Sequence, residues 1–148
     1  MNLLETINHD LNASLKSKDK AGVDLLRLLK AALKNEMIDL KRDDLKDDDV
    51  IRVLKKEAKK RQDAITLFEQ GGRNELALKE EQELVRIKKY LPEQMSREQI
   101  MELAKQVLVS LGETGSNQFG QVMKTVMQKA AGRADGAVVS EVVRGLMN

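Results

Sequence analysis

The sequence contains no cysteine and no tryptophan, and it has one proline, one tyrosine and two phenylalanines. Without cysteine the chain has no disulfides, no thiolate zinc ligands and no thiol nucleophile. Strands are usually rich in aromatic and β-branched side chains, whereas this chain is rich in Leu, Lys, Glu and Ala, which favour helices. The composition therefore predicts an all-α protein.

Long hydrophobic runs are also missing. The N-terminal residues 1–18 carry a polar side chain every few positions, unlike the apolar core of a signal peptide. No stretch elsewhere stays apolar for the roughly 20 residues of a membrane span. We therefore expect a cytoplasmic protein that does not enter a membrane.

The common catalytic and phosphate-binding motifs are absent: the chain has no GxxxxGK[ST], GxGxxG, HExxH, EF-hand or GxSxG pattern. The single histidine, His9, cannot build a metal cluster. The aspartates within residues 43–49 lack the alternating ligands and the bend-making glycine of a calcium loop. Ser110, Ser116 and Ser140 lack a motif that would activate them. We expect no metal, no cofactor and no self-contained catalytic site.

Apolar residues at helical spacing predict four helices before Pro92, over residues 1–17, 20–42, 50–70 and 74–90. Short loops between them predict an antiparallel bundle. The expected helix caps are Asp19, Asp48 or Asp49, and Asn74, and the expected stop of the third helix is Gly71-Gly72. The apolar stripes expected to face the core are Leu3, Leu4, Ile7, Leu11 and Leu15; Leu25, Leu28, Leu29, Ala32, Leu33, Met37 and Leu40; Val50, Leu54, Ala58, Ile65 and Phe68; Leu76, Leu84, Ile87 and Leu91.

Pro92 is the only proline, and it pushes the preceding residue out of helical geometry. We place a boundary there, between an N-terminal bundle (1–92) and a C-terminal three-helix lobe (93–148). In the lobe, Ser96 and Gln99 fit a capping box that starts a helix at Arg97, which runs to Gly112. The expected caps of the last two helices are Asn117 and Asp135, and Gly132 is expected to end the first of them in a left-handed conformation.

The charge of the chain is nearly balanced, because 26 basic side chains face 24 acidic ones. Any surface for a polyanion must therefore come from cations gathered on one face. Spacings of three and four gather cations on the helix over 50–70, and we call them the ridge: Arg52, Lys55, Lys56, Lys59 and Lys60. The ridge is either a phosphate-binding surface or a solvated helix face.

Arg61 lies on the apolar side of the same helix, where an unpaired charge is costly. One reading pairs it with Glu36, Glu57 or Glu80. The other reading places its guanidinium in a groove for an anionic ligand. Replacing Arg61 by Met distinguishes the two.

Four segments of the sequence are specific in combination: LLRLLKAALKNEMID (25–39), KKRQDAITLFEQGGRNELALKEEQEL (59–84), IKKYLPEQMSREQI (87–100) and FGQVMKTVMQKAAGRADGAVVSEVV (119–143). With these segments the chain resembles the YqeY-like proteins, relatives of the C-terminal tail domain of the B subunit of aspartyl/glutamyl-tRNA amidotransferase. Members usually have Lys where this chain has Gln121, and a small residue where it has Lys124.

The resemblance implies two helical lobes and an association with glutamine-dependent transamidation of mischarged tRNA. The family label is carbon-nitrogen ligase activity with glutamine as amido-N-donor. Nothing in this sequence matches the catalytic parts of the amidotransferase, so we do not expect this chain to perform the reaction alone. The implied partners are tRNA and amidotransferase or other protein subunits, and we expect neither DNA nor membrane.

Three hypotheses follow. The first is a tRNA-binding accessory module. Its first contact is the small lobe, through Lys124, Lys129, Arg133 and Arg144, and its second contact is the ridge over 50–70. A phosphate could also meet the helix start near Gln118, where Gly115 and Gly120 allow a close approach. The second is a protein-interaction module with no RNA ligand, favoured if Met123, Met127 or Met147 is exposed. The third is an enzyme subunit that contributes to amide transfer only with other subunits.

Overall fold

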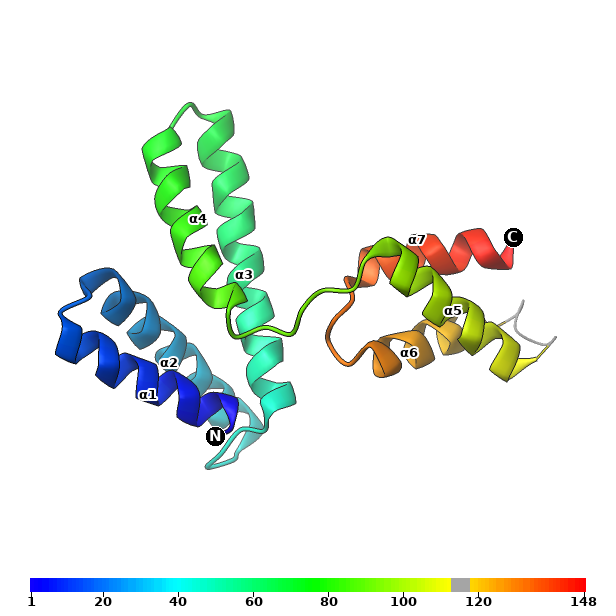
Figure 1. Ribbon diagram of the computed structural model, residues 1–148, viewed down its shortest axis with the longest axis horizontal. Coiled ribbons are helices and arrows are strands. Elements are labelled where there is room, and N and C mark those ends of the chain that lie inside the picture. The colour runs from blue at the N-terminus through cyan, green and yellow to red at the C-terminus, as the bar shows by residue number, and fades with distance from the viewer. Residues whose placement is uncertain (113–117) are drawn as a thin grey trace. The chain divides into compact units, whose positions relative to one another are not determined.

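The chain folds into helices joined by short connections in the computed structural model, which describes residues 1–112 and 118–148 (Figure 1). The prediction of an all-α fold is confirmed. The described residues form seven helices and no strand: α1 (Leu3–Ser17), α2 (Lys20–Leu40), α3 (Asp47–Gln70), α4 (Asn74–Lys88), α5 (Arg97–Leu111), α6 (Phe119–Ala130) and α7 (Gly136–Met147).

The chain divides into two compact units, Met1–Leu91 and Pro92–Asn148. Each unit has its own hydrophobic core, built from its own helices. The division falls at Pro92, where the pyrrolidine ring disfavours helical geometry at Leu91. No helix in the described parts of either unit is both long enough and apolar enough to cross a bilayer.

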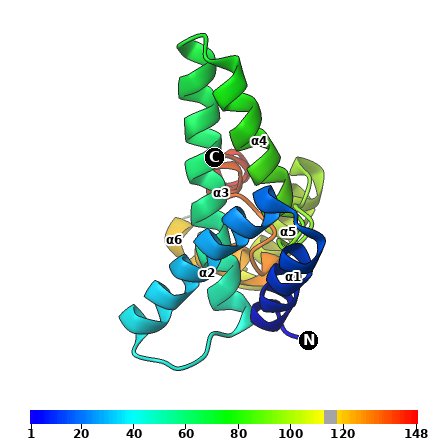
Figure 2. The same cartoon turned by 90° about the vertical axis from the view of Figure 1, so that its left-hand side faces the viewer.

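The four helices of the N-terminal unit form two antiparallel hairpins, α1–α2 and α3–α4 (Figures 1 and 2). The α3–α4 hairpin extends beyond the α1–α2 hairpin, so the four helices do not pack side by side along their full length. The largest fully buried residues of the main core are Ile7, Leu29, Leu33, Leu45, Val50, Leu54 and Ile87. A smaller core between α3 and α4 contains Ile65, Ala77 and Leu84.

Most of the predicted apolar stripes face these cores, but three of the predicted residues do not. Leu15, Leu28 and Leu76 are exposed, at 45%, 46% and 40% of their surface. Leu26, two positions before Leu28, and Ala77, next to Leu76, are buried instead. The predictions were wrong at these positions because helical spacing leaves the edge of a stripe undefined until the neighbouring helix is placed.

Of the side-chain caps predicted for the helices of the N-terminal unit, one is confirmed and the others are wrong. Asp19 caps α2 as expected, since its carboxylate accepts the Gly22 N–H at 3.2 Å. The prediction for α3 was wrong, because the helix begins at Asp47 and Asp49 lies inside its first turn, where it accepts the Lys46 N–H at 3.1 Å. Asn74 is not a cap either; it is the first residue of α4.

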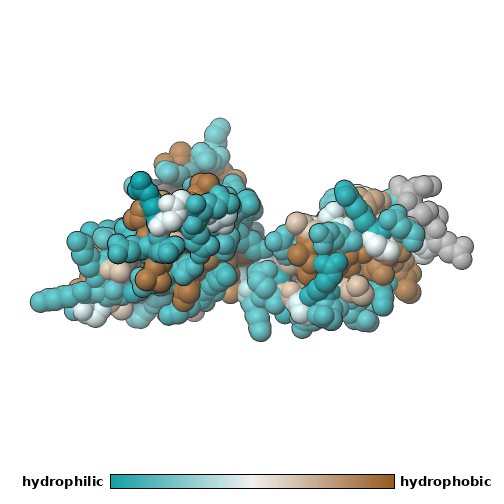
Figure 3. All heavy atoms as spheres, turned by 90° about the horizontal axis from the view of Figure 1, so that it is seen from above, coloured by the Kyte–Doolittle hydropathy of each residue, from teal (hydrophilic) through white to brown (hydrophobic). Residues whose placement is uncertain are grey.

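The C-terminal unit is a three-helix lobe in which α5, α6 and α7 contact one another. The capping box is confirmed, because Ser96 accepts the Gln99 N–H and Gln99 accepts the Ser96 N–H. Apolar residues of all three helices form the core: Ile100, Ala104, Val107, Val122, Val126, Ala130, Ala134, Val139, Val142 and Val143. Figure 3 shows that part of the lobe's visible face is also hydrophobic.

The turn between α6 and α7 is held by two consecutive left-handed residues. Ala131, the C-cap of α6, has φ 49° and Gly132 has φ 81°, so Gly132 follows the helix in a left-handed conformation as predicted. Asp135 caps α7 as expected by accepting the Ala137 N–H at 2.8 Å. The predicted cap Asn117 and the glycine at position 115 lie outside the described residues.

Candidate nucleic-acid interface

The ridge lies on α3, and we call it the α3 ridge. Its cations are largely engaged with carboxylates. Arg52 lies 3.0 Å from Asp49 and 3.5 Å from Glu36, with both distances measured from its Nη2 atom. Two lysines pair along the helix, Lys59 with Asp63 at 3.8 Å and Lys60 with Glu57 at 3.2 Å. Lys55 and Lys56 form no ion pair within the described part of the chain. Neighbouring acids therefore offset much of the charge of this ridge.

Asp49 is the centre of the ion-pair network at the start of α3. Its carboxylate accepts the Lys46 N–H and contacts Arg42 and Arg52, each at 3.0 Å. The Lys46 N–H, then Arg52 and Arg42, hold the pKa of Asp49 below its ordinary value of 3.8, although burial acts in the opposite direction. The network joins the end of α2 to the start of α3 and fixes the α2–α3 corner.

Lowering the pH should reduce the stability that the Asp49 network contributes at the α2–α3 corner. Because the folded-state pKa of Asp49 lies below 3.8, its stabilising contribution is complete above that pH and is lost as pH falls through the folded-state value. We expect the Asp49→Asn variant to be less stable than wild type at pH 6 and to lose less further stability on acidification. Urea denaturation at a series of pH values measures both. Equal pH dependence in the two proteins would contradict this role.

Arg61 is buried and paired, as one of the two readings expected. It is 6% exposed, and its guanidinium donates to the carboxylate and the carbonyl of Glu57, one helical turn earlier. Its Nε also donates to Glu83 of α4 at 3.3 Å. Of the three expected partners only Glu57 is correct; Glu36 pairs with Arg52 instead, and α4 presents Glu83 to α3. Arg61 thus links the two helices of the hairpin.

Four cations of the C-terminal lobe were candidates, and two of them, Lys124 and Lys129, lie on different sides of α6. Lys124 and Lys129 are exposed on α6 and form no ion pair with any residue that the structure describes. Five residues apart, they point about 140° away from each other around the helix axis. Arg144 stacks on Phe119 at the start of α6, with 5.4 Å from its Cζ atom to the ring centre.

Arg133 has a structural contact that the sequence did not indicate. Its Nε donates to the Glu93 carbonyl at 3.0 Å, and its own carbonyl accepts the Met95 N–H at 2.7 Å. These bonds tie the segment after Pro92 to the α6–α7 turn. The PEQM and GRAD segments of the sequence are therefore partners in space, and Arg133 holds its guanidinium in a fixed place at the surface of the lobe.

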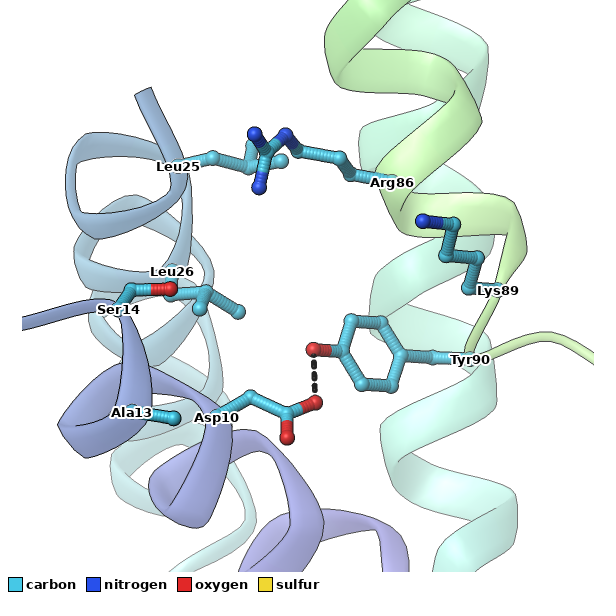
Figure 4. A pocket seen from close by; sticks show the side chains of 8 residues that line it. All are labelled: Asp10, Ala13, Ser14, Leu25, Leu26, Arg86, Lys89 and Tyr90. Carbon is cyan, nitrogen blue, oxygen red and sulfur yellow. Dashed lines mark hydrogen bonds between the residues drawn. The ribbon is translucent and has the colours of Figure 1, made fainter. Parts of the chain in front are cut away.

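A pocket with a volume of about 240 Å³, lined by both polar and apolar side chains, lies between α1, α2 and the end of α4 (Figure 4). Tyr90 donates its hydroxyl proton to Asp10 across the pocket, and burial, helped by this carboxylate, raises the pKa of Tyr90 above its usual range. Arg86 donates to Asp19 at 3.0 Å and lowers the pKa of that carboxyl. These partners lie 80 and 67 residues apart in the chain, so no local sequence signal indicates them.

Two acids at the connection between α2 and α3 accept hydrogen bonds from backbone N–H groups. Asp47 accepts the Leu3 N–H at the start of α1, and Asp44 accepts the Leu45 N–H, both at 2.9 Å. Within the described residues no group of three His, Cys, Asp or Glu side chains is arranged to hold a metal ion. The loop therefore serves to connect α1, α2 and α3.

The fold and these charged faces define a class: an all-α protein of two helical units with exposed cations. A family model described as Yqey-like protein matches residues 4–147. The chain belongs to the YqeY-like family. It is also similar to the uncharacterized protein C22F3.15 of Schizosaccharomyces pombe, with 36% identity over 97 residues, which cover 64% of this chain and 76% of the relative.

Proposed function

We propose that this protein is an accessory module that binds the body of tRNA and acts beside the enzymes of glutamine-dependent amide transfer. The observation that carries the proposal is the presence, on both helical units, of exposed cations that form no ion pair with a described residue, such as Lys34, Lys124 and Lys129. Cations on the outside of rigid helices suit recognition of RNA by its backbone and shape.

The rival function, a protein-interaction module, has less support. It requires flexible thioethers on an open surface. Met123, Met127 and Met147 are half-buried and pack against the core of their own lobe. The side chains that would line an apolar groove are therefore largely used inside the lobe.

Salt titration of tRNA binding tests the proposal. Each phosphate contact should lower the logarithm of the affinity by roughly 0.7 to 0.9 per decade of salt. We expect fluorescence anisotropy of labelled tRNA at two salt concentrations to give a slope that corresponds to several contacts. Random single-stranded RNA of equal length is the control. The proposal fails if no tRNA binds at low salt or if the control RNA binds equally well.

A further inference from the structure

Exposed cations that form no ion pair with a described residue gather along α2, which runs along the near side of the N-terminal unit in Figure 2. At about 100° per residue the four cations within the helix fall within a sector of about 80°, and Lys41 follows them as the left-handed C-cap residue. The buried leucines of the helix lie on another side. We call the cations, all of them exposed, the α2 stripe: Lys20, Arg27, Lys30, Lys34 and Lys41.

The α2 stripe differs from the α3 ridge in its partners. None of its five cations lies within 4 Å of a carboxylate of the described residues, whereas Arg52, Lys59 and Lys60 of the ridge all do. Of the acids of α2, Glu36 is engaged by Arg52. Asp24 and Asp39 are exposed beside the stripe and form no ion pair with the residues described. The stripe therefore keeps its charge available to a ligand.

A hollow of about 400 Å³ lies at the C-terminal end of the stripe. Its apolar lining residues are Met37 and Ile38, and Ile38 is 65% exposed. Its other lining residues are the cations Lys34, Lys41 and Arg42 and the acid Asp43. Apolar and cationic side chains around one hollow suit a ligand that has both negative charge and a flat apolar face.

The length of the stripe selects the kind of ligand. From Lys20 to its end at Leu40 the helix rises by about 30 Å, with about 5 to 10 Å between successive cations. A single phosphate or a free nucleotide would meet only one or two of them, so the stripe fits an extended polyanion. A membrane surface fits poorly, because a membrane-bound amphipathic helix buries its apolar face in lipid. The apolar face of α2 is buried in the protein core instead.

We propose that the α2 stripe, and not the α3 ridge, is the phosphate-contacting surface of the N-terminal unit, and that the hollow at Ile38 receives an unstacked base of the bound RNA. The inference rests on the proposed function and locates the tRNA-binding surface of the N-terminal unit. An RNA strand brings regularly spaced phosphates together with bases that can leave the stack in loops.

The test compares two triple variants with equal loss of charge, measured in the full chain by tRNA anisotropy at two salt concentrations. Lys30→Gln/Lys34→Gln/Lys41→Gln removes cations from the stripe, and Lys55→Gln/Lys56→Gln/Lys59→Gln removes them from the ridge. We expect the first to lose affinity on the order of 100-fold at 0.1 M salt and to reduce the salt slope by roughly 2 to 3. The second should stay within about threefold of wild type. Gln keeps the helix propensity of Lys, and circular dichroism checks the fold.

Ile38→Ser tests the hollow separately. We expect weaker tRNA binding with an unchanged salt slope, because no charge is removed. Binding equal to wild type would overturn the base contact.

The possible failures are distinguishable. If wild type binds tRNA but the stripe variant binds equally well, the inference fails and the proposed function stands. An equal or larger loss in the ridge variant also overturns the inference. If wild type binds no tRNA, both fail. If a polyglutamate peptide of matched charge binds wild type as well as tRNA does, the stripe belongs to an acidic protein partner, which overturns an RNA site.

Discussion

Replacing Arg61 by Met should lower the free energy of unfolding by about 3 to 5 kcal/mol, the cost of leaving a buried carboxylate without its partner. The side chains of Arg61 and Glu57 are 7% and 8% exposed. Lys60 also contacts Glu57, but its side chain is 70% exposed and compensates little. Met has a helix propensity close to that of Arg, so the loss reports the ion pair. Urea denaturation followed by circular dichroism measures it.

Two further variants give this experiment its controls. Lys60→Met removes the exposed partner of the same carboxylate and should cost less than about 1 kcal/mol. Glu57→Met combined with Arg61→Met replaces the buried pair by apolar side chains and should recover most of the loss. If Arg61→Met alone is as stable as wild type and only tRNA binding is lost, Arg61 belongs to a ligand groove and the structural role is wrong.

The sequence predicted the helices well because their signals are local. The spacing of apolar residues by three and four predicted all seven helices, and Asp19, Ser96 and Asp135 were correctly identified as caps. A cap needs only a hydrogen bond to a backbone N–H two or three residues away. Such contacts join residues that are close in the sequence, so they can be predicted without knowledge of the tertiary fold.

The candidate site was harder to predict because its contacts are not local. Glu80 and Glu83 lie one helical turn apart on α4, so the partner of Arg61 depended on how α4 turns toward α3. The bond between Arg133 and Glu93 joins residues 40 positions apart. On the α3 ridge the pairs within the helix, such as Lys60 with Glu57, follow from spacings of three and four, whereas the pair between Arg52 and Glu36 of α2 needs the tertiary fold.

Replacing Val126 by Asp should unfold the C-terminal lobe and leave the N-terminal unit folded. Val126 is fully buried in the lobe core. A core of this size supplies only about 3 to 5 kcal/mol, and a buried carboxylate without a partner costs several kcal/mol, so the lobe cannot absorb the change. In amide NMR spectra we expect the peaks of residues 92–148 to collapse to unfolded positions while those of residues 1–91 remain.

Val109→Asp is the matched control, because Val109 is 83% exposed on α5 and the same substitution there should leave every peak in place. Unfolding of the whole chain in Val126→Asp would contradict the independence of the two units. A lobe that stays folded would contradict the burial of Val126. Either outcome is visible in the same spectra.

The Val126→Asp protein also separates the two units as RNA-binding surfaces. Lys124, Lys129 and Arg133 lose their fixed positions when the lobe unfolds, whereas the α2 stripe lies on a helix whose buried residues belong to the core of the N-terminal unit. If the stripe contacts phosphates, the variant should still bind tRNA, with a salt slope reduced by the contacts of the lobe alone. Complete loss of binding would instead assign the phosphate contacts to the C-terminal lobe, where the sequence first placed them.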